Sequence, residues 1–264
     1  FNMSVGYDID GLKSPKIDTY IESMKNAAAT SVWKEAMAWL NANLAAIPNL
    51  KQADIDAISP EISNSITLST LHGCPPAQIE VMAKYLLEEK KVHTFVKCNP
   101  PLLGYEKARA LLDGMGYDYI SFDDHHFKND LQYSDAVGML GRLMEYAAER
   151  KRSFGVKITN TFPVKITKSE LPGEEMYMSG RALFPLSINV AAKLAKDFDG
   201  KLPISYSGGA DASNITDLFK TGIPPNTVAT TDLKPGGCEL SRELASMPEP
   251  SMPTLWKGDA KRGP

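Results

Sequence analysis

Four side chains with acid–base or metal-binding chemistry stand in a row in the segment YDYISFDDHHF, residues 117–127. Asp123 and Asp124 precede His125 and His126, which are half of the four histidines in the chain. Carboxylates and imidazoles transfer protons and ligate metal ions. Alternating apolar residues over 117–122 predict a strand, so the polar residues would emerge at its carboxyl end.

Consecutive residues at a strand end project in different directions, so four of them in a row seldom bind one ion. The pattern therefore favours no metal site. Asp124 and His126 become candidates for proton transfer in a polar loop over a substrate. A hydrogen-bonded structural turn is the alternative reading.

Lys97 lies inside the apolar segment HTFVKC, residues 93–98. Burying a lysine costs free energy unless an anionic or polar partner compensates it. We therefore expect Lys97 on the inner face of a sheet, in contact with a cofactor. A lysine that reaches solvent between helices is the alternative.

Cys74 and His72 share the glycine- and proline-containing loop STLHGCPP, residues 69–76. A thiol near an imidazole can act as an acid, base or nucleophile. A buried, inert thiol is the alternative. Further along, VKITNTF places Asn160 and Thr161 after another strand, where amide and hydroxyl groups could hydrogen-bond a planar heterocycle.

Ser207, Gly208 and Gly209 follow the segment LPISYS and precede a predicted helix. Glycines let the main chain approach an anion, and a helix start adds N–H donors. In many barrels, the loops after the last two strands bind phosphate. VATTDLKPGG, residues 228–237, would supply the second loop here. A tight turn without a ligand is the alternative.

Short apolar runs alternate with amphipathic segments along most of the chain. The expected strands cover residues 65–71, 93–98, 117–122, 154–159, 202–207 and 226–231. Between the strands expected at 154–159 and 202–207, apolar residues recur at helical spacing: Leu186, Val190, Leu194 and Phe198. This order predicts βαβ units and a parallel sheet. No G-x-G-x-x-G loop follows any strand, which favours a TIM barrel over a doubly wound fold.

The fold class is thus an α/β, TIM (β/α)8-type barrel, incomplete because about six of eight strands are recognisable. FNMSVGYD at the start is a further candidate strand, and the missing strands are expected before residue 1. Residues 1–62 read as a helical lead-in, residues 63–246 as the barrel, and residues 247–264 as a proline-rich exit linker.

Composition narrows the classes of function. Lys and Arg number 29 against 32 Asp and Glu, so no basic field favours nucleic acid. No apolar run approaches the roughly 20 residues of a membrane span. Three cysteines are too few and too scattered for a disulfide framework. We expect a cytoplasmic protein with a small-molecule substrate.

Two family resemblances add to these observations. LSTLHGCPPAQIEVMAKYLLEEKKVHTFVKCNP resembles the active-site loop, helix and lysine-bearing strand of dihydroorotate and dihydropyrimidine dehydrogenase barrels. SPKIDTYIESMKNA, FDDHHFKNDLQ and ELPGEEMYMSGRALFPL resemble the barrel portion of the selenate reductase family more closely. The resemblance implies a longer chain whose 4Fe-4S, FAD and NAD(P)H modules lie outside this segment and supply electrons.

The resemblance also assigns residues. Cys74 takes the place of the catalytic acid–base. The expected FMN contacts are Lys97, Asn160, Ser179, Gly180, Gly208, Gly209, Thr230 and Thr231.

The resulting hypothesis is an oxidoreductase domain that transfers a hydride between FMN and an unsaturated or heterocyclic molecule, with Cys74 or a nearby histidine exchanging the proton. Two alternatives stay open. One is a non-redox barrel enzyme that uses Lys97 or Lys157 as a Schiff base, or the Asp-His segment as a metal site. The other is a degenerate barrel that serves as a scaffold.

Overall fold

Five parallel strands form the central sheet of the computed structural model, which describes residues 2–70, 73–223 and 226–229 with the single residues 233, 237, 239 and 242. Their order in the sheet is β1 (Met3–Val5), β2 (Ser65–Ser69), β3 (His93–Cys98), β4 (Phe154–Ile158) and β7 (Ile204–Tyr206). Tyr206 also forms a parallel bridge to Asn226. The last expected strand therefore begins beside β7, although residues 230–231 lie outside the described part.

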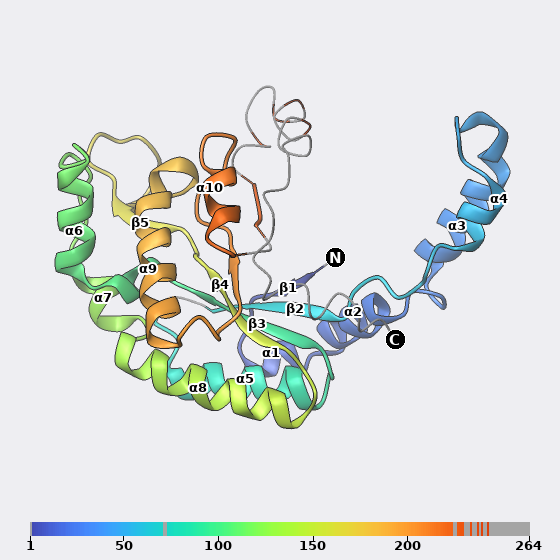
Figure 1. Ribbon diagram of the computed structural model, residues 1–264, viewed down its shortest axis with the longest axis horizontal. Coiled ribbons are helices and arrows are strands. Elements are labelled where there is room, and N and C mark those ends of the chain that lie inside the picture. The colour runs from blue at the N-terminus through green and yellow to red at the C-terminus, as the bar shows by residue number, and fades with distance from the viewer. Residues whose placement is uncertain are drawn as a thin grey trace.

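Helices cover one face of this sheet. α5 (Pro76–Glu88) packs on β3, whereas α8 (Tyr133–Glu149) and α9 (Phe184–Asp197) pack on β4 (Figure 1). The predicted stripe on α9 is confirmed for Leu186, Val190 and Leu194, which are fully buried, whereas Phe198 caps the helix and is only partly buried. The remaining helices are α1 (Ile9–Leu12), α2 (Pro15–Lys25), α3 (Ser31–Asn43), α4 (Gln52–Asp56), α6 (Tyr105–Gly114), α7 (His125–Asn129) and α10 (Ile215–Lys220), with 3-10 turns η1 (Leu44–Ala46), η2 (Pro100–Leu103) and η3 (Gly180–Leu183).

Successive side chains of a strand point to opposite faces of the sheet. In β3, Thr94, Val96 and Cys98 are buried against the helices, while Phe95 and Lys97 are only partly buried on the opposite face. This alternation follows from the two-residue period of a strand. The face away from the helices is therefore available to form a site.

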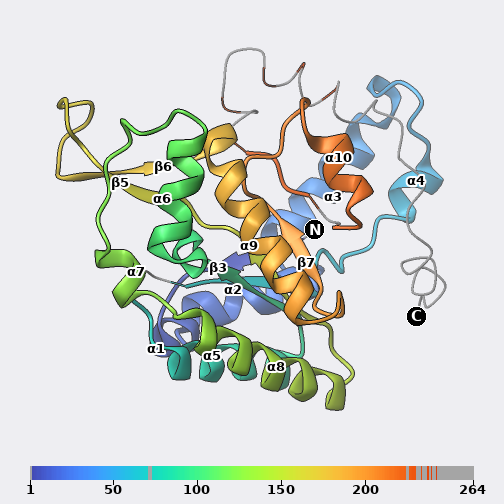
Figure 2. The same cartoon turned by 60° about the vertical axis from the view of Figure 1, so that its left-hand side comes forward.

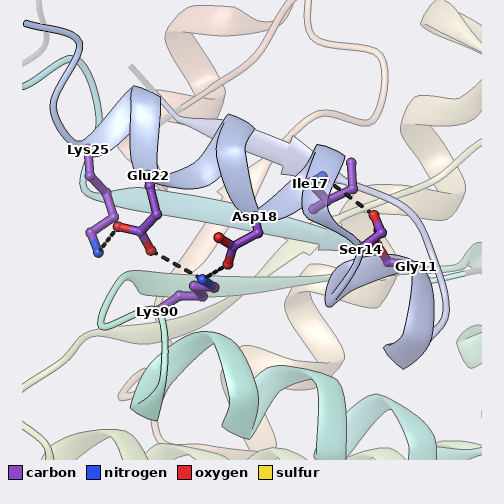
Figure 3. A network of polar contacts seen from close by, with 7 residues as sticks. All are labelled: Gly11, Ser14, Ile17, Asp18, Glu22, Lys25 and Lys90. Carbon is purple, nitrogen blue, oxygen red and sulfur yellow. Dashed lines mark hydrogen bonds and ion pairs between the residues drawn. The ribbon is translucent and has the colours of Figure 1, made fainter. Parts of the chain in front are cut away.

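The first residues of the chain take part in the sheet, because β1 pairs with β2 from Met3↔Ile66 to Val5↔Leu68. The candidate strand near the start is thereby confirmed within the expected helical lead-in. The Ser14 hydroxyl accepts the Ile17 N–H at 3.5 Å and caps α2 (Figure 3).

Lys90 fastens α2 to the turn after α5 (Figure 3). Its Nζ lies 3.2 Å from the Glu22 carboxylate and also pairs with Asp18. Burial disfavours the charged amine, yet the hydrogen bonds from Asp18 and Glu22 leave the pKa of Lys90 raised. The ion pairs stabilise the packing of α2 against the rest of the fold.

α3 and α4 form an arm that extends away from the sheet (Figure 1). No residue of α3 is buried, and Trp39 remains 58% exposed. A hydrogen bond of 2.8 Å from the Ala27 N–H to the Pro60 carbonyl closes the base of the arm. The chain thus leaves and rejoins the domain at adjacent positions.

The expected strand at 117–122 is wrong. β3 pairs directly with β4, so no strand lies between them. The Arg109 guanidinium instead donates to the carbonyls of Tyr117 and Ile120 at 3.1 and 2.7 Å. Phe122 packs edge-on against Phe162. Phe122 therefore belongs to an aromatic cluster with Tyr105, Phe127 and Phe162 rather than to a sheet face.

An antiparallel hairpin that the sequence analysis did not predict follows β4. It consists of β5 (Phe162–Lys165) and β6 (Glu175–Met178), and it lies beside α6 in Figure 2. The Lys165 N–H donates to the Ser121 carbonyl at 2.8 Å, which joins the hairpin to the segment 117–122. Within the described part of the chain, no helix combines the length and apolar character that a bilayer crossing requires.

Candidate functional site

A pocket of about 210 Å³ lies at the carboxyl ends of β3, β4 and β7. Two lysines, Lys97 and Lys157, line it, and the loops around them add glycine and hydroxyl groups. The hydroxyl-bearing lining residues are Thr159, Thr161, Ser179, Ser207 and Thr227. In a TIM barrel, this end of the strands carries the active site.

Lys97 and Lys157 are direct neighbours in the parallel register of β3 and β4. Neither lysine forms an ion pair within the described part of the chain. Burial lowers the pKa of both amines, and the charge of Lys157 lowers the pKa of Lys97 further. Two close, half-buried cations without a carboxylate favour the binding of an anionic or electron-rich group.

The glycines of the loop after β7 are required by close packing. A Cβ on Gly208 would overlap the Ser187 hydroxyl of α9, and a Cβ on Gly209 would overlap the Gly180 carbonyl. Gly209 also has a φ of +85°, a conformation that favours glycine. The loops that contain Gly180 and Gly209 therefore meet and form one wall of the pocket.

Hydrogen bonds fix this wall to the sheet. The buried hydroxyls of Thr159 and Ser187 lie 2.8 Å apart, and the Ser207 N–H donates to the Ile158 carbonyl at 2.6 Å. Beside them, Arg181 pairs with Asp211 at 2.7 Å. Burial opposes the charged form of Asp211, but hydrogen bonds from Ser213 and Arg181 lower its pKa.

Among the described candidates, Asn160, Gly208 and Cys74 are not part of the pocket lining. The Asn160 side chain donates to the Asn99 amide oxygen at 2.7 Å. Cys74 is half-buried just before α5, and burial raises its pKa, so the thiol is neutral near pH 7. His72, Thr230 and Thr231 fall outside the described residues, as does the expected exit linker at 247–264.

Asp124 and His126 lie at the start of α7, away from the pocket lining. Asp124 pairs with Lys128, and His126 Nε2 lies 3.1 Å from the Glu175 carboxylate on β6. Nearby, Asp123 pairs with Lys165 of β5 at 2.8 Å. These contacts attach the α7 segment to the hairpin. The described residues contain no group of three or more His, Cys, Asp or Glu suited to a metal ion.

Lys157, Thr159, Ser207 and Thr227 line the pocket but are not among the FMN contacts expected from the sequence. Lys157 carries the same signal as Lys97, a lysine inside an apolar strand, but the sequence connects it only with Schiff-base chemistry. Thr159, Ser207 and Thr227 carry no distinguishing signal, because a hydroxyl residue after a strand is common in loops.

Comparison with known proteins places this arrangement in a family. Residues 1–258 match the family model described as "Oxidoreductase YgfK, N-terminal TIM-barrel domain". The chain belongs to this family. Its expected TIM-barrel class is thereby confirmed, although the five strands of the described sheet do not close into a ring.

Two Escherichia coli proteins, from strain K12 and from O157:H7, are similar to this chain, and each is named "Putative oxidoreductase YgfK". Each is 50% identical over 248 residues, which cover 90% of this chain and 24% of the relative. The chain therefore spans about a quarter of the length of these relatives. The oxidoreductase family agrees with the expected class of activity.

Proposed function

We propose that this domain is the FMN-binding barrel of a longer, multi-module oxidoreductase, which transfers a hydride between FMN and an unsaturated or heterocyclic small molecule. The observation that carries the proposal is the pair of half-buried lysines, Lys97 and Lys157, at the pocket floor without a carboxylate partner in the described part.

The residues of the pocket fit a phosphorylated flavin. The paired amines offer positive charge to an electron-poor ring that becomes anionic on reduction, or to a phosphate. The hydroxyls of Ser179 and Ser207 and the main chain at Gly180 and Gly209 offer hydrogen bonds at the opposite wall. Thr230 and Thr231 stay proposed as further contacts.

Bound FMN would supply the two-electron chemistry that no protein side chain provides. The chain would supply the proton. Cys74 keeps its proton on Sγ near pH 7, because burial raises its pKa. A neutral thiol at the carboxyl edge of the sheet can give a proton to a substrate atom that gains a hydride, and can take it back in the reverse direction. His72, Asp124 and His126 stay proposed as alternatives for this role.

Electrons would reach this domain from elsewhere in the protein. The relatives are about four times as long as the matched segment, which leaves room for 4Fe-4S, FAD and NAD(P)H modules. We propose these modules as partners within the same longer chain.

The absorbance spectrum of the purified full-length protein tests the proposal. We expect a flavin absorbance band at about 450 nm and release of FMN when the protein is denatured. The double variant Lys97→Met/Lys157→Met should lose FMN but keep FAD. A protein that contains no FMN and takes up none when it is added would contradict the proposal.

A Schiff-base enzyme is a second candidate, and the lowered pKa of both lysines favours it. A lysine near another cation is more often unprotonated, and only the neutral amine attacks a carbonyl carbon. Borohydride reduction in the presence of a carbonyl substrate such as pyruvate would leave a covalent adduct on Lys97 or Lys157. The flavin model expects no adduct.

A further inference from the structure

Asp130 is a buried carboxylate that none of the roles described above uses. It directly follows α7, and only 4% of its surface is exposed. Its own N–H donates to the His126 carbonyl at 2.9 Å, and Gln132 donates to its carbonyl at 2.7 Å. These two hydrogen bonds fix the main chain of Asp130, from which the carboxylate extends.

The two carboxylate oxygens of Asp130 accept hydrogen bonds from different elements. Oδ1 accepts the Gly73 N–H at 2.8 Å, in the loop that contains Cys74. Oδ2 accepts the Asn99 side-chain amide at 3.0 Å, just after β3. Hydrogen bonds to a charged group are the stronger ones, and breaking a buried one leaves a desolvated partner.

The network continues to β4. The Asn99 amide oxygen accepts from Asn160 Nδ2 at 2.7 Å, and the same nitrogen lies 3.4 Å from the Thr70 carbonyl. Thr70 in turn donates to the Lys97 carbonyl at 3.1 Å. A chain of hydrogen bonds thus connects the thiol loop with the strand that carries Lys97.

We propose that Asp130 is a positioning residue, which fixes the Cys74 loop at the carboxyl edge of the sheet through Gly73 and Asn99. The inference rests on the proposed function, in which Cys74 exchanges the proton. Asp130 itself touches neither substrate nor flavin.

The loop needs such an anchor for a physical reason. Gly73 adopts a φ of +75°, and a Cβ there would meet no atom of the described residues within 4 Å. Side-chain packing therefore does not restrain this residue, and glycine is the residue with the most conformations to lose. The hydrogen bond to Asp130 restrains it instead and keeps Cys74 half-buried.

The first test measures the alkylation rate of Cys74 by iodoacetamide in full-length protein, followed by mass spectrometry of the Cys74 peptide. In Asp130→Ala, we expect the rate at pH 8 to rise by about tenfold, the order expected from loss of a hydrogen bond to a charged group. The pH midpoint of alkylation should fall, because a more exposed thiol loses the burial that raises its pKa.

A charge swap separates positioning from general damage. Asp130→Asn alone places an amide donor against the Asn99 amide donor, and a rotation of Asn99 only transfers the mismatch to Asn160. In Asn99→Asp/Asp130→Asn, each of the three hydrogen bonds has a donor and an acceptor again. We expect the double variant to regain slow alkylation that the single variant lacks.

Asp8→Ala is the matched control, because Asp8 also accepts a backbone N–H at 2.8 Å but caps α1. It should leave alkylation unchanged. Equal alkylation rates in wild type and Asp130→Ala, or no recovery in the double variant, would overturn the proposal. These readouts need no flavin, so a protein without FMN would contradict the proposed function and leave this test intact.

Discussion

At the scale of single residues, the lysine pair lowers the stability of the ligand-free fold and favours the binding of an anionic ligand. Lys97 and Lys157 lie side by side in a half-buried position, and burial lowers the pKa of each. Keeping both amines protonated therefore opposes folding of the ligand-free protein. Functional sites commonly retain such unfavourable groups because the ligand compensates them.

Replacing Lys97 with methionine should stabilise the flavin-free protein and weaken FMN binding. We expect the thermal midpoint to rise by about 2–4 °C, the shift that roughly 1 kcal/mol produces in a domain of this size. Scanning calorimetry measures the midpoint, and flavin fluorescence measures the dissociation constant, which should increase about tenfold. Lys107→Met, at an exposed position on α6, is the control.

The sign of the pH effect follows from the pKa shift. Because the pKa of Lys97 is lower in the folded chain, the destabilisation is complete at neutral pH. It shrinks as the pH rises through the folded pKa towards the unfolded value of about 10.4. A Lys97→Met variant that is less stable than wild type near pH 7 would contradict this account.

At the scale of elements, one ion pair joins α5 to α8 over the sheet. Arg142 Nη2 lies 2.6 Å from the Glu80 carboxylate, and Lys84 lies 2.8 Å from it. The hydrogen bond from Arg142 is the largest cause that lowers the pKa of Glu80 to about 2. The pair supports the packing of two helices whose buried residues cover β3 and β4.

Glu80→Gln should lower the thermal midpoint at neutral pH and should lower it progressively less as the solution becomes acidic. Because the folded pKa of Glu80 is depressed, its stabilisation is present above the unfolded pKa and is lost as the pH falls towards about 2. Thermal melts between pH 7 and pH 3 should show the two proteins converging below about pH 4.5. A constant difference across this range would assign the effect to packing instead.

Sequence periodicity predicts a strand correctly where alternate residues are buried on one face of the sheet. Lys97 stands at an alternate position of β3, and its apolar neighbours Val96 and Cys98 are buried. The segment 117–122 carries a similar pattern, yet Phe122 is used by the aromatic cluster around Phe162. Periodicity does not distinguish these cases, because it does not show what the alternate residues pack against. No residue of 117–122 is fully buried, and Tyr119 is 70% exposed.

Some features of the site depend on contacts between segments that are distant in the sequence, and these could not be predicted. Lys157 becomes important only through its register with Lys97, and Asp130 only through its contact with Gly73, 57 residues earlier. Gly208 and Gly209 were expected from their position after a strand, but their packing on Ser187 and Gly180 required the fold.

At the scale of the whole molecule, the arm of α3 and α4 is a separate unit. Ile55 of α4 is 1% exposed, yet it does not belong to the main hydrophobic core. Val32 and Trp39 on α3 remain 74% and 58% exposed. Ile55 is thus the single buried residue between residues 28 and 59, and the arm contributes little to the packing of the sheet.

Replacing residues 28–59 with a short Gly–Ser turn should leave the sheet and its pocket intact. Ala27 and Pro60 already share a hydrogen bond of 2.8 Å, so a turn can join them without moving either. We expect the thermal midpoint to change by less than about 2 °C, since shortening a loop alters the closure free energy only by fractions of a kcal/mol. FMN uptake should equal that of the intact protein.

Two alanine variants sharpen the same test. Ile55→Ala should leave the global midpoint nearly unchanged, because its cavity forms within the arm. Leu140→Ala, at a fully buried position of α8, should cost about 2–5 kcal/mol, the range for removing a core leucine. If Ile55→Ala or the deletion lowered the midpoint as much as Leu140→Ala, the arm would be part of the cooperative core. Equal thermal midpoints of the intact and shortened proteins would show that the barrel folds without the arm. The exposed Trp39 side chain would then not be needed for folding.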